Sequence, residues 1–395
     1  MSEMDFPEPE ADVESFTPEQ LKEDIDAGED VTILDVRAEN EFEEWHIDGG
    51  NVEIANVPYF DLLEGVDEED LERIPEGDPL VVLCAKGGSS EYIAGMLADE
   101  GRDVVHLEEG MNGWATIYEA YEVETDSDAT ILQYQRPSSG CLAYLVVDGD
   151  EAAIVDPLRA FTDRYLEDAD AYGADLTYAI DTHIHADHIS GVRALDDEGV
   201  EGVIPEPATD RGVTYADEVT TVEHGDVLEV GDAEIEVVYT PGHTSGMTSY
   251  LLDGEVIATG DGLFTESVAR PDLEEGDEGA PDAAKQLYES LQTRVLTLDD
   301  DVLVGGAHFS DAAEPASDDT YTASIGELTE TMDALTMDEE EFVELILSDM
   351  PPRPANYVDI IETNLGQQSA TDDEAFTLEL GPNNCAASQD ALTSD

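Results

Sequence analysis

Three histidines and one carboxylate lie within six consecutive positions near the middle of the chain, at His183, His185, Asp187 and His188. A β-type run at 176–181 precedes them, and a helix-type run at 189–198 follows. Imidazole and carboxylate groups are the usual protein ligands of divalent metals. In an extended segment the first three side chains would share one face, and His188 would join them at the turn. The spacing therefore predicts a metal site rather than a polar strand end.

Three further candidate ligands each follow an apolar run downstream. His243 comes after the run at 237–239, Asp261 after 255–260 and His308 after 302–307. Residues at the ends of neighbouring strands meet at one edge of a sheet, so positions far apart in the sequence can share a site. Each residue alone is a weak signal, but the ordered set predicts one metal centre.

Cys84 indicates a second kind of chemistry. It leaves an apolar β-type run at 79–83, and a glycine-rich loop then leads into a helix-type run at 91–100. Main-chain N–H groups in such a loop, together with a helix N-terminus, favour an anionic sulfur, and Lys86 adds a positive charge. We therefore interpret Cys84 as a nucleophile or persulfide carrier rather than as a structural thiol.

The charge balance is extreme, because the 395 residues include 99 Asp and Glu against 14 Lys and Arg, a formal net charge of −85. Regular apolar runs argue against disorder, so we expect a folded chain with an acidic surface, similar in composition to cytosolic proteins of extreme halophiles. We expect folding to depend on high salt, since screening relieves the self-repulsion. Nucleic acids and anionic membranes are disfavoured as partners.

Cysteine usage and the first residues bear on the compartment. Cys84, Cys141 and Cys385 are widely spaced, which predicts free thiols in a reducing compartment. Cys141 is interpreted as a core residue and Cys385 as exposed. The first residues carry neither a basic region nor an apolar run, and no stretch has the apolar length of a membrane span. We therefore expect a cytoplasmic protein without a signal peptide.

Two domains are expected, because the length exceeds what one hydrophobic core usually supports. Residues 1–13 are predicted to be a disordered acidic leader. Short β-type and helix-type runs alternate over 14–122, which is typical of a parallel sheet flanked by helices. A polar linker is predicted at 123–127, a strand-rich domain at 128–366 and a flexible tail at 367–395.

Residues 14–122 resemble a rhodanese domain. The similarity rests on Leu34-Asp35-Val36-Arg37, on Glu41-Phe42 with His46-Ile47-Asp48-Gly49, on the Cys84 loop and on Gly110-Met111-Asn112-Gly113-Trp114. Rhodaneses carry sulfane sulfur on the loop cysteine, so the resemblance implies a persulfide on Cys84, with Lys86 as the loop cation. Asp35 and Arg37 are interpreted as a structural hydrogen-bonded pair.

Residues 128–366 resemble the metallo-β-lactamase superfamily in the His-x-His-x-Asp-His run, the Pro-Gly-His-Thr loop, the Thr-Gly-Asp segment and the late histidine. The fold implied is an αββα sandwich with its metal site at the sheet edges. In a two-metal member, the first ion would be bound by His183, His185 and His243, the second by Asp187, His188 and His308, and Asp261 would bridge them.

Segments 259–273 and 351–357 resemble the persulfide dioxygenase branch of this superfamily, and a fused rhodanese handles the same sulfur species. That branch uses one iron held by two histidines and one carboxylate, with open positions for substrate and O2. The resemblance implies one Fe(II) per chain on His183, His243 and Asp261, and it leaves His185, Asp187, His188 and His308 as surrounding groups or a second site. Arg270 is a candidate for binding a substrate carboxylate or for holding Asp272.

The activity implied is the oxidation of a low-molecular-weight thiol persulfide by O2 to sulfite and free thiol. Cys84 would pass sulfane sulfur to a thiol, or combine sulfite with a persulfide to give thiosulfate. Two alternatives remain open. One is a thioester hydrolase of the glyoxalase-II type that holds two Zn(II) per chain and carries an appended rhodanese. The other is a sulfur carrier or persulfide sensor with a vestigial metal site. A homo-oligomer is possible under each of these functions.

Overall fold

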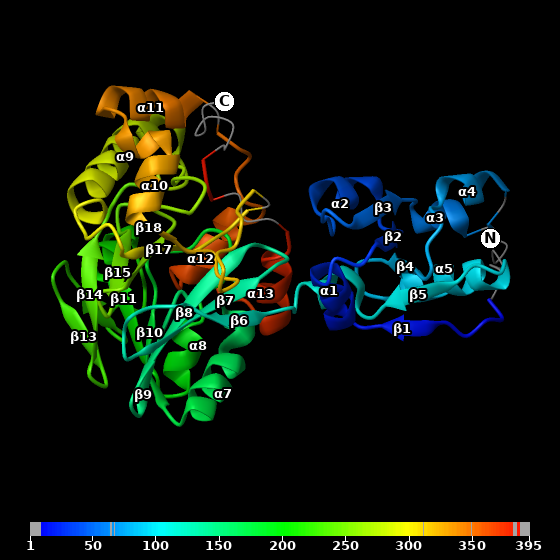
Figure 1. Ribbon diagram of the computed structural model, residues 1–395, viewed down its shortest axis with the longest axis horizontal. Coiled ribbons are helices and arrows are strands. Elements are labelled where there is room, and N and C mark those ends of the chain that lie inside the picture. The colour runs from blue at the N-terminus through cyan, green and yellow to red at the C-terminus, as the bar shows by residue number, and fades with distance from the viewer. Residues whose placement is uncertain are drawn as a thin grey trace. The chain divides into compact units, whose positions relative to one another are not determined.

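The computed structural model describes residues 9–63, 65–66, 68–310, 312–348, 350–381 and 385–387. It contains two compact units (Figure 1). The first comprises the residues up to Ile117 together with Arg136–Ser138, and the second comprises Tyr118–Gln135 and the residues from Ser139 onward. Residues 1–8 of the expected leader, and residues 382–384 and 388–395 of the expected tail, lie outside the described residues.

The first unit is built on a five-stranded sheet in the order β1-β5-β4-β2-β3, with every pairing parallel. Its strands are β1 (Glu14–Phe16), β2 (Val31–Asp35), β3 (Val52–Asn56), β4 (Leu80–Leu83) and β5 (Val104–Leu107). Its helices are α1 (Pro18–Asp26), α2 (Glu39–Glu44), α3 (Tyr59–Leu62), α4 (Glu68–Arg73), α5 (Gly88–Asp99) and α6 (Gly110–Trp114). The parallel sheet flanked by helices that the sequence predicts is confirmed.

Strand β4 shows why helices cover both faces of this sheet. Val82 belongs to a core that includes Leu97 of α5. Val81 and Leu83 belong to a different core, which includes Leu21 of α1. Consecutive side chains of a strand point to opposite faces, so an uninterrupted apolar strand needs a cover on each side. The arrangement leaves the residue after β4, Cys84, at the end of a rigid central strand.

The first unit ends earlier than the expected boundary after residue 122. Strand β6 (Glu119–Glu122) pairs antiparallel with β7 (Thr130–Arg136) and is the edge strand of a sheet in the second unit. The polar residues 123–127 therefore lie in the connection of a hairpin and not in a linker between domains. Turns and linkers share a polar composition, which is why composition alone misplaces this boundary.

The second unit contains two sheets, in the strand orders β12-β11-β10-β9-β8-β7-β6 and β13-β14-β15-β16-β17-β18. The further strands of the first sheet are β8 (Cys141–Asp148), β9 (Glu151–Val155), β10 (Asp175–Ile180), β11 (Glu201–Pro205) and β12 (Thr220–Val222). The second sheet consists of β13 (Val227–Val230), β14 (Ala233–Tyr239), β15 (Thr248–Leu252), β16 (Val256–Gly260), β17 (Leu303–Gly306) and β18 (Ala323–Ser324).

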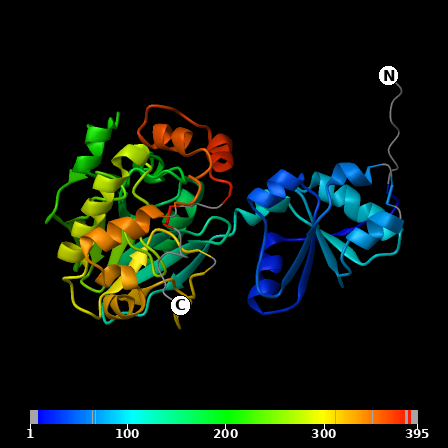
Figure 2. The ribbon, with the colours of Figure 1, turned by 90° about the horizontal axis from the view of Figure 1, so that it is seen from above.

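The two sheets face each other across one apolar core, which includes Tyr144 and Val146 of β8 and Val237 of β14. The alternating β8 residues, such as Leu145, face a second core with α7 (Thr162–Tyr172) and α8 (Val192–Asp197). A third core packs α9 (Gly276–Ser290), α10 (Ile325–Thr331) and α11 (Glu339–Ser348) onto the other sheet (Figure 2). The αββα sandwich is thus confirmed.

The C-terminal segment is more ordered than the sequence indicates. Helix α12 (Tyr357–Asn364) is followed by α13 (Asp372–Leu378), within the region expected to be a flexible tail. Beyond it Ala386 pairs with Ala269, and Cys385 is buried rather than exposed. Neither the short helix nor the isolated bridge has a long periodic pattern, so the sequence gives little sign of them. Within the described chain, no helix has the length and apolar content needed to cross a membrane.

Candidate metal centre and cysteine loop

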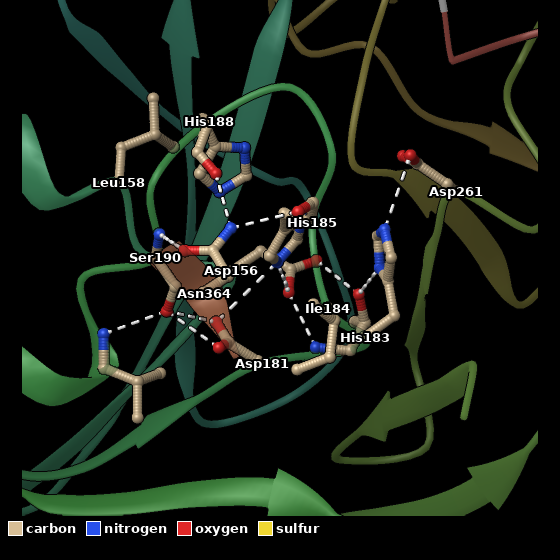
Figure 3. Close-up of polar contacts among 12 residues, drawn as sticks. Asp156, Leu158, Asp181, His183, Ile184, His185, His188, Ser190, Asp261 and Asn364 are labelled. Atoms are coloured by element: carbon tan, nitrogen blue, oxygen red, sulfur yellow. Dashed lines mark hydrogen bonds and ion pairs between the residues drawn. The ribbon is translucent and has the colours of Figure 1, made fainter. Parts of the chain in front are cut away.

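Strand ends bring the candidate ligands together in the second unit. Asp156 follows β9, and the segment 181–188 follows β10. His243 lies in the loop after β14, Asp261 follows β16, and His308 lies just beyond β17. All of these side chains are buried, and Figure 3 shows the polar contacts of part of the group. The structure thus brings side chains from separate strand ends into one buried cluster.

His183, His243 and Asp261 form a group whose ligand atoms all lie within 4.8 Å of one another. The Nε2 atom of each histidine is 3.5 Å from the same oxygen, Asp261 Oδ2. Two ligands of one ion, each bonded at about 2.0–2.2 Å, are separated by roughly 3.0–3.6 Å. His183 Nε2 and Asp261 Oδ2 are buried and have no hydrogen-bond partner among the residues that the structure describes. Such atoms are costly unless something binds them, so the three side chains fit a shared cation.

His183 and His243 each make a hydrogen bond through Nδ1, which leaves the Nε2 lone pair of each ring available. Thr182 Oγ1 lies 2.9 Å from Asp156 Oδ2, to which it donates, and 2.9 Å from His183 Nδ1, whose proton it therefore accepts. His243 Nδ1 donates to the carbonyl of Arg270 at 2.9 Å. Burial lowers the pKa of both imidazoles, that of His183 to about 4. Both rings are thus held neutral, in the tautomer that presents Nε2 to a metal.

His308 lies between two carboxylates. Its Nδ1 is 2.6 Å from Asp261 Oδ1, and its Nε2 is 2.7 Å from Asp187 Oδ2. Carboxylate oxygens only accept hydrogen bonds, so both ring nitrogens carry protons and neither offers a lone pair to a metal. Burial opposes this charge, but Asp261 and Asp187 raise the pKa of His308 well above its ordinary value. His308 thereby fixes one oxygen of Asp261 and leaves Oδ2 facing His183 and His243.

Asp187 and His188, which the sequence assigned with His308 to a second metal ion, are bonded to each other, and Asp187 is also bonded to His308. Asp187 Oδ2 also accepts a hydrogen bond from His188 Nδ1 at 3.0 Å and one from the thiol of Cys141 at 3.3 Å. Cys141, Asp187, His188 and His308 satisfy the distance requirement of a four-ligand group. The short separations from Asp187 Oδ2 are, however, those of hydrogen bonds. Cys141 is buried, as a core residue would be, but its thiol belongs to the polar network of this site.

His185 bonds to carboxylates through Nε2, and its Nδ1 is buried without a hydrogen-bond partner among the described residues. Its Nε2 lies 3.1 Å from Asp156 Oδ1 and 3.6 Å from Asp181 Oδ1 (Figure 3). Burial lowers its pKa, but the carboxylates more than offset this and raise the pKa of His185 to about 9. His185 therefore serves as the counter-charge of two buried carboxylates.

Gly260 allows β16 to approach the histidine segment closely. Its φ is +52°, a region that residues with a side chain seldom adopt. A Cβ atom at this position would lie 2.5 Å from Thr182 Oγ1 and 2.3 Å from the terminal methyl carbon of Met247. A glycine immediately before Asp261 is therefore a steric requirement of the site.

Arg270 is held by structural contacts. Its Nε and Nη2 donate to the two carboxylate oxygens of Asp272 at 2.8 and 3.1 Å, and its Nη1 donates to the carbonyl of Pro352 at 2.8 Å. The guanidinium is buried. Of the two roles that the sequence left open, these contacts match the pairing with Asp272, while the carbonyl of Arg270 orients His243. A short Arg-x-Asp spacing cannot distinguish these roles before the side chains are placed.

The Cys84 loop lies in the first unit, between β4 and α5. Cys84 is almost buried, and its thiol donates to Ser90 Oγ at 3.4 Å, while the Ser90 hydroxyl donates to the carbonyl of Gly87 at 2.8 Å. Lys86 is exposed on the same loop. As predicted, Asp35 and Arg37 form a buried pair, joined by bonds of 2.6–3.1 Å.

Sequence reasoning missed several residues of the metal centre. Asp156 follows a strand in the same way as Asp261 does, so the strand-end criterion could have found it. Thr182 adjoins the histidine run, but a hydroxyl is a poor metal ligand, so its residue type gives no signal of a role there. Cys385 lies within 4.8 Å of Asp261 and His308, and no local pattern in its surroundings marks it.

Comparisons with known proteins agree with this architecture. The family model for the metallo-beta-lactamase superfamily matches residues 137–308, and that for the rhodanese-like domain matches residues 17–117. The fold and the site thus define a metallo-β-lactamase-type protein with an N-terminal rhodanese-like domain.

Individual relatives indicate which branch of the superfamily the chain resembles. The chain is 31% identical over 255 residues to the mitochondrial persulfide dioxygenase ETHE1 of Homo sapiens. The matched stretch covers 62% of this chain and 92% of the relative. A crystal structure of ETHE1 from Myxococcus xanthus gives a TM-score of 0.50 at 30% identity, over 60% of this chain and 98% of that one. A hydroxyacylglutathione hydrolase from Synechococcus is 32% identical over 174 residues, which is 42% of this chain and 63% of that relative. The chain belongs to the ETHE1 family.

The contact between Thr182 and His183 makes a first prediction. Thr182→Val keeps the shape of the side chain but removes the hydroxyl that links Asp156 to His183. We expect Co(II) to bind the metal-free variant about 10–100-fold more weakly than the unchanged chain, the usual range for losing a group that orients a metal-ligating histidine. Thr182→Ser retains the hydroxyl and should bind nearly normally. Equal affinity of all three proteins in an optical titration would contradict this role.

His185 makes a second prediction, on the stability of the metal-free chain. Its pKa of about 9 in the folded state lies above the value of about 6.5 in an unfolded chain. The folded state therefore binds this proton more tightly, and the stabilisation is complete below about pH 6.5 and lost as the pH rises through about 9. We expect the denaturant midpoint in molar salt to fall over this range. His185→Gln should lower the midpoint at neutral pH and reduce its slope with pH, and an unchanged slope would refute the assignment.

Proposed function

We propose that this protein is a persulfide dioxygenase that holds one Fe(II) per chain through His183, His243 and Asp261. The observation that carries the proposal is the division of the ligand-type residues into two groups. Two imidazoles and one carboxylate present atoms suited to one cation, while His308 and His185 donate to carboxylates. Two nitrogens and one oxygen with further positions open are the ligand set that suits Fe(II) in O2 chemistry.

The likeness to ETHE1 supports the same reading. The chain spans most of the length of the human relative, whereas it spans a smaller share of the hydroxyacylglutathione hydrolase. A two-zinc hydrolase would use His308 as a ligand of its second ion, and both nitrogens of that ring are instead bonded to buried carboxylates. The substrate class that follows is a small thiol persulfide, with O2 as the second substrate.

In the proposed reaction one persulfide, one O2 and one water give one thiol, one sulfite and two protons. The terminal sulfur is oxidised, O2 is reduced, and the sulfur–sulfur bond is cleaved. Bound Fe(II) would supply the redox chemistry and the open positions. The chain supplies the geometry: Thr182 and the Arg270 carbonyl orient the two imidazoles, and His308 holds Asp261. Burial of all three ligands keeps bulk water from competing with the carboxylate.

For the first unit we propose sulfane-sulfur transfer through Cys84. An acceptor thiolate or sulfite would attack the outer sulfur of a Cys84 persulfide, form a new bond to it and release the Cys84 thiolate. Ser90, in the first turn of α5, contacts the sulfur directly, and main-chain N–H groups of a glycine-rich loop of this kind would favour an anionic sulfur. Exposed Lys86 would favour the approach of an anionic acceptor or donor.

Metal content and oxygen consumption test the dioxygenase. The full chain, reconstituted in molar salt, should hold one iron and consume O2 only when a thiol persulfide is supplied. Asp261→Asn should lower both iron content and O2 uptake by at least about 100-fold, because the variant replaces the anionic ligand. Asp217→Asn, in an exposed position before β12, serves as the control and should behave normally. Two zinc ions with thioester cleavage and no O2 uptake would establish the hydrolase instead.

Cys84→Ser tests the sulfur-transfer step separately. The variant keeps the size and polarity of the side chain but cannot form a persulfide, so transfer of sulfane sulfur to a thiol or to sulfite should be abolished. Persulfide-dependent O2 uptake with an added small persulfide should remain within about twofold, since its ligands lie in the other unit. Loss of both activities would contradict two independent sites.

A further inference from the structure

The amide side chain of Asn364 contacts the backbone of the histidine segment. Asn364 is the last residue of α12, and its position in the sequence is far from the segment 185–190. Its Nδ2 donates to the carbonyl of His185 at 3.0 Å and to the carbonyl of His188 at 2.8 Å. Its Oδ1 accepts from the main-chain N–H of Ser190 at 2.9 Å. Figure 3 shows Asn364 among these residues.

This pattern uses both donors and the acceptor oxygen of a carboxamide. An amide offers two N–H donors on one atom and an acceptor on the other, and here each N–H has its own carbonyl while the oxygen has an N–H. Asn364 is buried, so water cannot replace a lost bond without entering the interior. A carboxylate of the same size would keep the bond to Ser190 but would face the carbonyls of His185 and His188 with an acceptor.

Three further contacts hold the C-terminal segment in place around Asn364. The carbonyl of Asn364, at the end of α12, accepts from Tyr215 Oη at 2.9 Å, and the carbonyl of Leu365 accepts from the N–H of Thr214 at 2.9 Å. Later in the chain, Glu379 Oε1 accepts from the N–H of Ile189 at 2.8 Å. Terminal carbonyls of a helix need such partners, and here they tie α12 to the body of the second unit.

We propose that Asn364 is a positioning residue of the metal centre and that the segment 357–379 acts as a clamp on the histidine segment. The clamp lies outside the residues matched by the metallo-beta-lactamase family model, which end at 308. It rests on the proposed metal centre but not on the reaction carried out there.

The clamp can reach the metal ligands by two routes. The carbonyl of His185 is fixed two residues after His183, so the backbone that carries the first ligand is held. The carbonyl of His188 is fixed next to Asp187, whose carboxylate binds His308. His308 in turn holds the Asp261 oxygen that does not face the cation. A shift of the segment would therefore displace ligands on both sides of the site.

Co(II) binding to the metal-free full chain, in molar salt, tests the clamp without relying on activity. Asn364→Asp should weaken Co(II) binding about 10–100-fold, the range expected when a group that orients metal ligands is lost, and should alter the visible absorption bands of bound Co(II). Asn40→Asp is the matched control, with the same substitution at an exposed position of α2 in the first unit. The control should bind Co(II) with unchanged affinity and spectrum.

The outcomes separate this proposal from the one on function. Unchanged affinity and spectrum in Asn364→Asp, even with a lower melting temperature, would overturn the clamp and leave the metal centre intact. If the unchanged chain binds no Co(II), the metal centre and the clamp both fall. If Asn364→Asp does not fold, Asn364→Ser takes its place, since it removes the amide without adding a charge, and the same loss of affinity is expected. A weakened Co(II) site in a chain without persulfide-dependent O2 uptake would support the clamp and refute only the dioxygenase.

Discussion

The position of His308 between Asp187 and Asp261 is the constraint on which the rest of the site depends. A doubly protonated imidazole bonded to two carboxylates cannot bind a metal. It also bonds to Oδ2 of Asp187, and it leaves one oxygen of Asp261 to complete a group with two neutral histidines. A dense run of ligand types is thus divided into a three-residue group suited to one cation and a hydrogen-bonded network beside it.

The same division explains how so many ionisable groups share a small buried volume. An isolated buried charge is expensive, and it is tolerated when an opposite charge and hydrogen bonds accompany it. His185 provides this for Asp156 and Asp181, and His308 provides it for Asp187 and Asp261. Neutral His183 and His243 need no counter-charge, and burial favours that state. The charge pattern thus follows from which carboxylates each ring can reach.

Much of this arrangement was predictable from the sequence, and the exceptions have physical reasons. Apolar runs ending in His243, Asp261 and His308 predicted the convergence of strand ends, since that depends only on local pattern and on how sheets are built. The bonding of Cys141 and the burial of Cys385 were not predictable, because each depends on which distant side chain lies opposite. Asn364 is the clearest case: its three partners are far away in the sequence, and a single asparagine at a helix end has no local signature.

The electrostatics of the centre and of the surface respond differently to salt. The formal charge of −85 comes mostly from carboxylates that far outnumber the cations available to pair with them, and the repulsion among exposed groups falls as ionic strength rises. Buried pairs are screened much less, because mobile ions cannot enter the space between them. The bonds of His308 and His185 should therefore keep their geometry over a range of salt concentrations in which the exposed surface changes strongly. Salt would then act on whether the chain folds, while the buried carboxylates and histidines decide what the folded chain can bind.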